Sequence, residues 1–167
     1  MVNKCKKLTI ILVLLSTVIT LCSCKPKDVE VYIFTDLSEC QAIESDQFTN
    51  AQVTVYDSPS NDKYIKDLDY SNFYACNYSS AQMNFELFAY EFPDSETAQA
   101  YFRNATGQAG NKAVNYLISE GLFSQTHHRI VCSKNLAYSI YTSPSDADAV
   151  ANYINHIFTE KIIDVMQ

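Results

Sequence analysis

Thiol and imidazole groups are the side chains of this sequence best suited to covalent or metal chemistry. Beyond residue 24 the chain has three cysteines and three histidines: Cys40, Cys76, Cys132, His127, His128 and His156. A thiolate with a neighbouring imidazole can act as a nucleophile, and both groups are ligands that zinc prefers. Either chemistry requires a particular spacing, or a cysteine with a lowered pKa in a cleft.

The spacing does not favour such a site. The sequence contains no Cys-x-x-Cys and no His-Glu-x-x-His, the patterns that usually supply metal ligands. His127 and His128 are adjacent, and adjacent residues of a strand point to opposite faces, so the two do not readily bind one ion. The chain has only three glycines, too few for a nucleophile elbow or a known phosphate-binding loop. We therefore assign no catalytic, cofactor-binding or metal-binding residue.

The cysteines beyond residue 24 lie at apolar positions of predicted elements. We expect Cys40, Cys76 and Cys132 to be buried as small hydrophobic residues, in preference to forming one internal disulfide. Their odd number leaves at least one thiol unpaired within the chain, and their disulfide state stays open. An enzyme built on one of them would need a free, low-pKa thiol beside a histidine.

The N-terminal residues have the parts of a secretory signal. Three lysines among the first seven residues precede Leu8–Leu21, a mostly apolar stretch of 14 residues. As a helix it would span about 21 Å, which is short of the ~30 Å hydrocarbon core of a bilayer. The sequence LCSC at residues 21–24 follows, and it resembles the lipobox of bacterial lipoproteins. The resemblance implies a diacylglyceryl group on the thiol of Cys24 and cleavage after Ser23.

These features predict three segments: a signal peptide at 1–23, the lipidated cysteine with a short tether at 24–28, and a single domain at 29–167. Each buried methylene of a lipid contributes ~0.8 kcal/mol, so two acyl chains hold a protein firmly on a membrane. We therefore expect a protein anchored by lipid at the extracytoplasmic face of the cell membrane. An ordinary cleaved signal followed by a free secreted domain is the alternative.

Composition and charge fit a folded domain that avoids polyanions. Hydrophobic residues make up 47% of the chain and charged residues 19%, which are values typical of globular proteins. The net charge is −7, and it becomes about −10 when the three lysines of the signal are removed. A polyphosphate is repelled by such a field, so we expect no nucleic-acid partner.

Residue patterns place strands and helices along the domain. Alternating or β-branched runs predict strands at 29–34, 52–56, 73–78, 83–92, 129–133 and 136–142. Residues 114–124 fit either a helix or a strand, and we favour extended structure. Helices are predicted from Ser38, from Asp94 to Gly107, and from Ser143 through Ile162. The many hairpins favour an α+β fold, a two-layer sandwich in which two or three helices pack on one face of a mainly antiparallel sheet.

Aromatic residues are unusually frequent, with 12 tyrosines and 9 phenylalanines. Six of those in predicted strands are Tyr74, Tyr78, Phe88, Tyr90, Tyr138 and Tyr141. The preference of aromatic residues for strands accounts for this enrichment. An exposed tyrosine face that binds a partner is the alternative interpretation.

The segment FELFAYEFPDSETAQAYFRNA at 85–105 resembles a recurrent element of small uncharacterised lipoproteins from Gram-positive anaerobic bacteria. The hairpin and helix at 129–158 are also similar to those of that group. The resemblance implies an envelope location and a compact α+β domain, but it brings no activity and no site residues. We therefore expect a non-enzymatic domain that binds a protein, a peptide or a small ligand, with no cofactor. An envelope enzyme that uses a Cys/His site is the alternative.

Overall fold

The computed structural model of the protein describes residues 28–44, 50–107, 116–123 and 125–165. The predicted signal peptide, Cys24 and most of the tether therefore lie outside the described residues. Glu30–Ile162 form one compact unit, which contains the central sheet and the helices. The described residues beyond it, 28–29 and 163–165, belong to the outer ends of strands β1 and β8.

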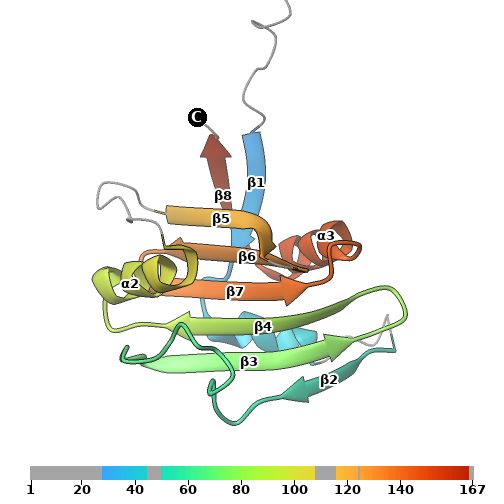
Figure 1. Cartoon of the computed structure of the whole chain (residues 1–167), viewed down its shortest axis with the longest axis horizontal. Helices are drawn as coiled ribbons and strands as arrows, with labels where there is room; N and C mark the ends of the chain where they lie inside the picture. The colour runs from blue at the N-terminus through green and yellow to red at the C-terminus, as the bar shows by residue number, and fades with distance from the viewer. Residues whose placement is uncertain (1–27, 45–49, 108–115, 124, 166–167) are drawn as a thin grey trace, which may run out of the picture. The chain divides into compact units, whose positions relative to one another are not determined.

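Six strands form the central sheet, in the order β2-β3-β4-β7-β6-β5, and every neighbouring pair is antiparallel. Figure 1 shows these strands lying side by side. Their bounds are β2 (Gln52–Val55), β3 (Asn72–Ser79), β4 (Asn84–Glu91), β5 (Tyr116–Phe123), β6 (Thr126–Ser133) and β7 (Leu136–Thr142). The extended structure favoured for 114–124 corresponds to β5.

The remaining elements are three helices and a strand pair. They are β1 (Asp28–Ile33), the 3-10 helix η1 (Leu37–Ile43), α2 (Ser95–Thr106), α3 (Ala147–Ile157) and β8 (Glu160–Val165). Strands β1 and β8 pair with each other in a separate two-stranded sheet. Together with the antiparallel sheet, these elements confirm the α+β class.

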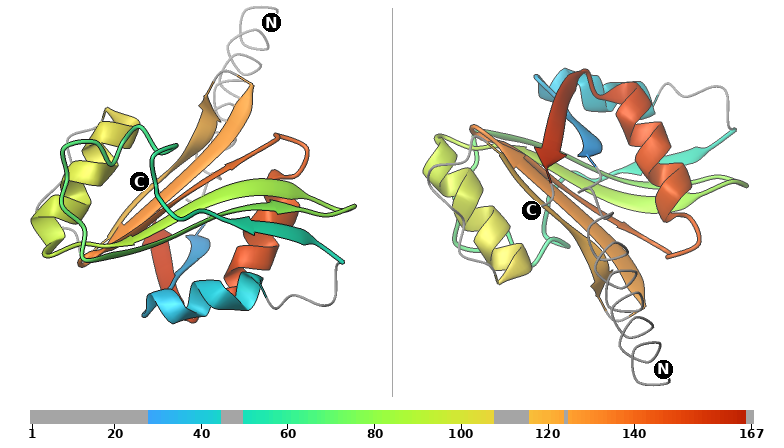
Figure 2. Two further views of the ribbon diagram at one scale, coloured as in Figure 1. Left: turned by 90° about the horizontal axis from the view of Figure 1, so that it is seen from below. Right: turned by 90° about the horizontal axis from the view of Figure 1, so that it is seen from above.

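The helices pack on both faces of the sheet, whereas the sequence predicted one face. Figure 2 shows α2 on one side of the sheet, and η1 and α3 on the other. We name these sides the α2 face and the α3 face. Both faces of β4 bury large side chains, since Phe88 and Tyr90 belong to the α2 face and Leu87 to the α3 face. A sheet that is apolar on both sides requires cover on both sides.

Helix α2 has the end signals that the sequence predicted. The side chain of Asp94 accepts a hydrogen bond from the backbone N–H of Thr97 at 2.8 Å, which caps the first turn. Gly107 ends the helix with φ at +68°, and its N–H bonds to the carbonyl of Arg103. This left-handed conformation favours glycine. The buried residues of the helix recur at the i, i+3, i+4, i+7 spacing of one helical face: Ala98, Tyr101, Phe102 and Ala105.

The first and last helices differ from their predictions. The first is a 3-10 helix capped by Asp36, whose side chain accepts from the N–H of Ser38. The last begins after Asp146, not at Ser143, and it ends at Ile157. The N–H of Thr159 bonds to the carboxylate of Glu39 at 2.9 Å, so the chain leaves the helix there. Ile162, at which the sequence predicted the end of this helix, lies in strand β8.

Candidate functional site

The α2 face changes from apolar to polar along its strands. Beneath α2 this face is apolar, and its side chains, among them Phe88, are buried. Phe88 belongs to a row of residues that are paired across the strands. The neighbouring row on the same face lies two residues further along each strand, and it consists of Asn77 in β3, Glu86 in β4, Tyr141 in β7 and His128 in β6. We call these four residues the polar row. Figure 2 shows that the sheet extends beyond α2 on this face. A part of the sheet that none of the described helices covers is therefore lined by polar and aromatic groups.

An open hollow of about 610 Å³ lies over this end of the sheet. Its volume is within the range of small-molecule sites, ~300–1,000 Å³. The lining residues come from the polar row, from the ends of the neighbouring strands and from the β5–β6 turn. They are Asn77, Asn84, Phe85, Glu86, Gln125, Thr126, Tyr141, Thr142 and Ser143. Only Glu86 is charged among these described residues.

Tyr141 forms the aromatic part of the hollow. Its ring stacks on the ring of His128 with centroids 4.4 Å apart and planes 5° apart, and His128 stacks in turn on Tyr64 at 6.1 Å. Burial, followed by the positive charges of His127 and Lys63, lowers the pKa of His128 to about 4. Burial also raises the pKa of Tyr141. His128 and Tyr141 are therefore uncharged at neutral pH, and the stacked rings hold one another in place.

The carboxylate of Glu86 is held beside this stack. The hydroxyl of Tyr56 donates a hydrogen bond to Glu86 Oε1 at 2.9 Å. The ring of Tyr56 lies on Phe88, with centroids 6.2 Å apart. Burial and the bond to Glu86 raise the pKa of Tyr56, so its phenol stays protonated as the donor. Glu86 thus presents a fixed carboxylate that can accept further hydrogen bonds.

The rim of the hollow is fixed through the backbone of Asn84. Its N–H donates to Asp146 Oδ2 at 3.0 Å, and its carbonyl accepts from the hydroxyl of Thr142 at 2.6 Å. The hydroxyl of Ser79 donates to the side-chain oxygen of Asn84 at 2.7 Å. These bonds tie β4 to β7 and to the start of α3, so the lining groups are held before any ligand arrives.

Asp62 is a buried carboxylate on the same face, and its hydrogen bonds are structural. It is 3% exposed. Its Oδ2 accepts from the hydroxyls of Tyr90 at 2.9 Å and Tyr101 at 2.6 Å, and its Oδ1 accepts from the N–H of Tyr64 at 2.9 Å. These bonds attach the loop between β2 and β3 to the sheet and to α2. Through that loop they place the Tyr64 ring in the stack.

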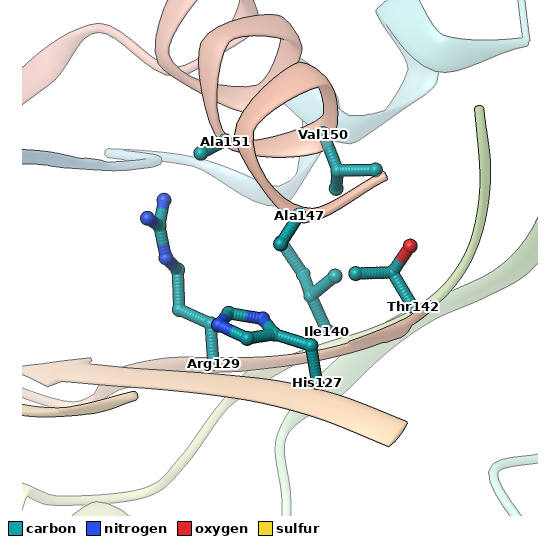
Figure 3. Close-up of a pocket in the computed structure, with 7 residues that line it drawn as sticks. All are labelled: His127, Arg129, Ile140, Thr142, Ala147, Val150 and Ala151. Atoms are coloured by element: carbon teal, nitrogen blue, oxygen red, sulfur yellow. The ribbon is translucent and has the colours of Figure 1, made fainter. Parts of the chain in front are cut away.

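A second, much smaller cavity lies on the α3 face, between β6, β7 and α3 (Figure 3). Its volume is about 10 Å³, which has room for about one water molecule. Arg129 Nη2 pairs there with both carboxylate oxygens of Glu120, at 3.0 and 3.1 Å. His127 Nε2 lies 3.3 Å from the same carboxylate. Because of its size, this cavity is not the candidate site for an organic ligand.

The cysteines considered for catalysis lie in the interior. Cys40, Cys76 and Cys132 are free and at most 2% exposed. Burial raises the pKa of Cys76 and of Cys132 to about 12, and it also raises that of Cys40. A catalytic thiol needs the opposite shift and an accessible position. The prediction of buried cysteines is confirmed, and these environments argue against the thiol enzyme considered as the alternative.

The histidines do not meet at one site. His127 faces Glu120 on the α3 face, whereas His128 stacks on Tyr141 on the α2 face. His156 is an exposed residue of α3. Within the described parts of the chain, no three His, Cys, Asp or Glu residues are grouped so that they could hold a metal ion.

The structure also decides between the two interpretations of the aromatic residues. Tyr74, Tyr78, Phe88, Tyr90 and Tyr138 are buried, and only Tyr141 of the six is partly exposed. Most of the set therefore belongs to the core. Two tyrosines that support the hollow lie in the chain that follows β2: Tyr56, which the sequence placed at the end of a predicted strand, and Tyr64. Nothing in the local pattern around either residue indicates this role. The polar row itself has a signal in the sequence, since Glu86 is the one charged residue between the polar ends of β4.

No described helix has the length and apolar character needed to cross a bilayer. Comparison with known proteins gives no family, because no family model and no curated protein matches the chain. Among solved structures, the chain is similar to the extracellular domain of PknH from Mycobacterium tuberculosis. The identity is 12% over 74% of this chain and 92% of that domain, with a TM-score of 0.36.

Proposed function

We propose that the chain is a lipoprotein anchored at the extracytoplasmic face of the cell membrane through Cys24. In this proposal its domain is a non-enzymatic binding module, and the hollow over the polar row is the binding site. The LCSC sequence at residues 21–24 supports the anchor. The hollow, with its fixed carboxylate and its stacked tyrosine, supports the binding role. The resemblance of residues 85–105 to small uncharacterised lipoproteins also supports an envelope location.

The environments of the reactive groups favour binding over catalysis. The described thiols are buried with raised pKa values. Asp62 is surrounded by donors and closed off from solvent. Glu86 is the charged group in the hollow, and it has a tyrosine hydroxyl as its neighbour in place of a second carboxylate. A glycosidase uses a pair of carboxylates, so this arrangement supports recognition of a ligand without its cleavage.

Incorporation of labelled fatty acid tests the anchor. Replacement of the modified thiol in the variant Cys24→Ser removes the attachment atom, so the label should disappear from the protein. Cys22→Ser is the matched control, because the position two residues before the modified cysteine is loosely defined and should keep both the label and the cleavage. Incorporation of label into Cys24→Ser, or its absence from the unchanged protein, would refute the anchor.

Photo-crosslinking in living cells tests the binding site. A photoreactive amino acid is placed at Gln125, an exposed residue in the wall of the hollow, and separately at Leu122, which is 65% exposed and belongs to the α3 face. We expect an adduct from position 125 and none from position 122. Equal adducts from both positions, or none from position 125, would contradict a binding role for the hollow.

A further inference from the structure

We propose that the hollow over the polar row binds an uncharged glycan, with one pyranose ring lying on Tyr141. This inference rests on the proposed function, because it names the class of ligand for the same site. Three properties of the hollow carry it: the charge of its lining, the type of its hydrogen-bonding groups, and the position of its aromatic ring.

The charge of the lining disfavours anionic ligands. Of the described side chains around the hollow, Glu86 alone is charged, and it is negative. Phosphate, sulfate and carboxylate groups need arginine, lysine or clustered backbone N–H groups as partners. The whole chain carries a net charge of −7, which also repels polyanions at long range. A ligand of this hollow is therefore neutral or cationic.

The hydrogen-bonding groups of the lining suit hydroxyls. Asn77 and Gln125 contribute amides, and Thr126 and Ser143 contribute hydroxyls. Each of these groups can both donate and accept. A sugar hydroxyl has the same double character, so it can donate to one neighbour and accept from another. The Glu86 carboxylate, held in place by Tyr56, can accept from two adjacent hydroxyls of one ring.

The aromatic ring suits the flat face of a sugar. Tyr141 is partly exposed, and its ring is held in place by stacking on His128 and by an edge contact with Phe88. The axial C–H groups of a pyranose form an apolar patch that packs on such a ring, while the equatorial hydroxyls reach the surrounding polar groups. Since the ring is held by its neighbours, little side-chain freedom is lost when the ligand binds.

Lipid and peptide ligands fit these observations less well. The apolar residue of the lining, Phe85, is only 3% exposed, so an acyl chain would find little apolar surface. An extended peptide binds most readily by pairing with the edge of a sheet. The hollow instead lies over β3, β4 and β7, which are paired on both sides. A cationic peptide attracted by Glu86 is the competing ligand, and the experiment includes it.

Calorimetric titration of the mature lipoprotein in detergent micelles tests this proposal. The probes are the uncharged tetrasaccharides chitotetraose, cellotetraose and maltotetraose, together with trilysine as the cationic probe. We expect at least one tetrasaccharide to bind, with an affinity that changes less than about twofold between low and high salt because no charge pair forms. We expect no binding of trilysine.

Substitutions in the lining test whether the tetrasaccharide binds in the hollow. Tyr141→Ala should weaken the tetrasaccharide about tenfold or more, and Gln125→Ala should weaken it by a smaller factor. Gln125 is exposed, so that variant reports on binding even where Tyr141→Ala fails to fold. Leu122→Ala, on the α3 face, is the matched control and should leave the affinity unchanged.

The proposal is overturned if no tetrasaccharide binds, if Tyr141→Ala and Gln125→Ala bind as well as the unchanged protein, or if trilysine binds in their place. Binding of trilysine with a strong dependence on salt would keep the hollow as a binding site and replace the glycan with a cationic ligand. Fatty-acid labelling and the crosslink from position 125 do not depend on the ligand class. Failure of the glycan proposal is therefore distinguishable from failure of the proposed function.

Discussion

The hydroxyl of Tyr101 donates a hydrogen bond to the carboxylate of Asp62 across 2.6 Å in the interior of the domain. Tyr101 belongs to α2, and Asp62 lies in the loop between β2 and β3. The same hydroxyl lies 2.7 Å from the hydroxyl of Ser139 on β7. One buried phenol thus connects a helix, a loop and the central sheet. The loop keeps its place, and Tyr64 keeps its position in the aromatic stack, because Asp62 accepts these bonds.

Replacement of Asp62 should therefore destabilise the protein strongly. Asp62→Ala leaves the hydroxyl of Tyr90 without its acceptor and takes one acceptor from Tyr101. A hydrogen bond to a charged group contributes about 1.5–3 kcal/mol, and we expect a loss of about 3 kcal/mol in the free energy of unfolding. Urea unfolding measures this loss.

Asp57→Ala, at an exposed position of the same loop, is the control and should change the free energy of unfolding by less than about 0.5 kcal/mol. Equal effects of the two variants would disprove the structural role of Asp62.

Local signals in the sequence predicted those elements whose ends are set by neighbouring residues. Helix α2 follows from Asp94 and Gly107, because a capping carboxylate and a left-handed glycine act within one helical turn. The hairpin of β6 and β7 turns at Lys134, whose φ of +55° suits such a tight turn. The strands around it follow from their alternating or β-branched residues.

Features that depend on distant contacts were missed. The end of α3 is set where Thr159 bonds to Glu39, which lies 120 residues earlier in the chain. The cover on both faces of the sheet depends on where η1 and α3 pack, and periodicity within one segment does not contain that information. Asp62 looked like an ordinary turn residue because its acceptor role requires Tyr90 and Tyr101.

The candidate site was only partly visible in the sequence for the same reason. The alternation of side chains along β4 indicates from the sequence that Glu86 and Glu91 lie on opposite faces of the sheet. The alignment of Glu86 with Asn77 and Tyr141 depends on the register of β3 and β7 against β4. The loop between β3 and β4 is short, so the β3–β4 hairpin is predictable from the sequence. A single sequence does not give the register of β7 against β4 across the long connection between them, so the complete polar row appears only in the folded sheet.

His128 should make the stability of the protein depend on pH. Its pKa is lowered from 6.5 to about 4 in the folded chain, chiefly by burial. Between these two pH values the unfolded chain binds a proton that the folded chain does not, so stability falls as the pH falls. The shift corresponds to roughly 3 kcal/mol of unfolding free energy over this range. Urea unfolding from pH 4 to pH 8 measures the slope.

The variant His128→Phe separates this effect from the titration of carboxylates. It keeps an aromatic ring against Tyr141 and removes the titrating group, so the slope between pH 4 and 6.5 should become shallower. His156→Gln, at an exposed position of α3, is the control and should keep the original slope. The prediction fails if His128→Phe and the unchanged protein have the same slope.

The buried thiols should resist alkylation in the folded protein. At pH 8, a pKa of about 12 leaves only a trace of thiolate at Cys76 and at Cys132. Both are also closed off from solvent, as is Cys40. We expect native alkylation by iodoacetamide to be at least about a hundredfold slower than that of an unperturbed thiol, and mass spectrometry follows it. The control variant Ser58→Cys places a thiol at an exposed loop position and should react at the ordinary rate. Rapid native modification of any of the three would contradict their burial.

Replacement of Glu120 and replacement of Arg129, which form an ion pair, should lower the free energy of unfolding by different amounts. Arg129 is 8% exposed, whereas the side chain of Glu120 is 29% exposed. In Glu120→Gln the buried cation loses its anion, and we expect a loss of about 1–3 kcal/mol, less than for a fully buried pair because Glu120 reaches solvent. In Arg129→Met the buried charge itself disappears and Glu120 remains partly hydrated, so the loss should be about 1 kcal/mol or less.

A double-mutant cycle on this pair tests the unequal response. The double variant Glu120→Gln with Arg129→Met should be more stable than Glu120→Gln alone, because the second change removes the unpaired charge that the first one leaves. Lys161→Gln breaks the exposed pair of Lys161 with Glu30 and should leave the unfolding midpoint unchanged. Urea unfolding of these variants measures each difference. If Arg129→Met destabilises the protein more than Glu120→Gln does, packing of the arginine side chain outweighs its charge at this position.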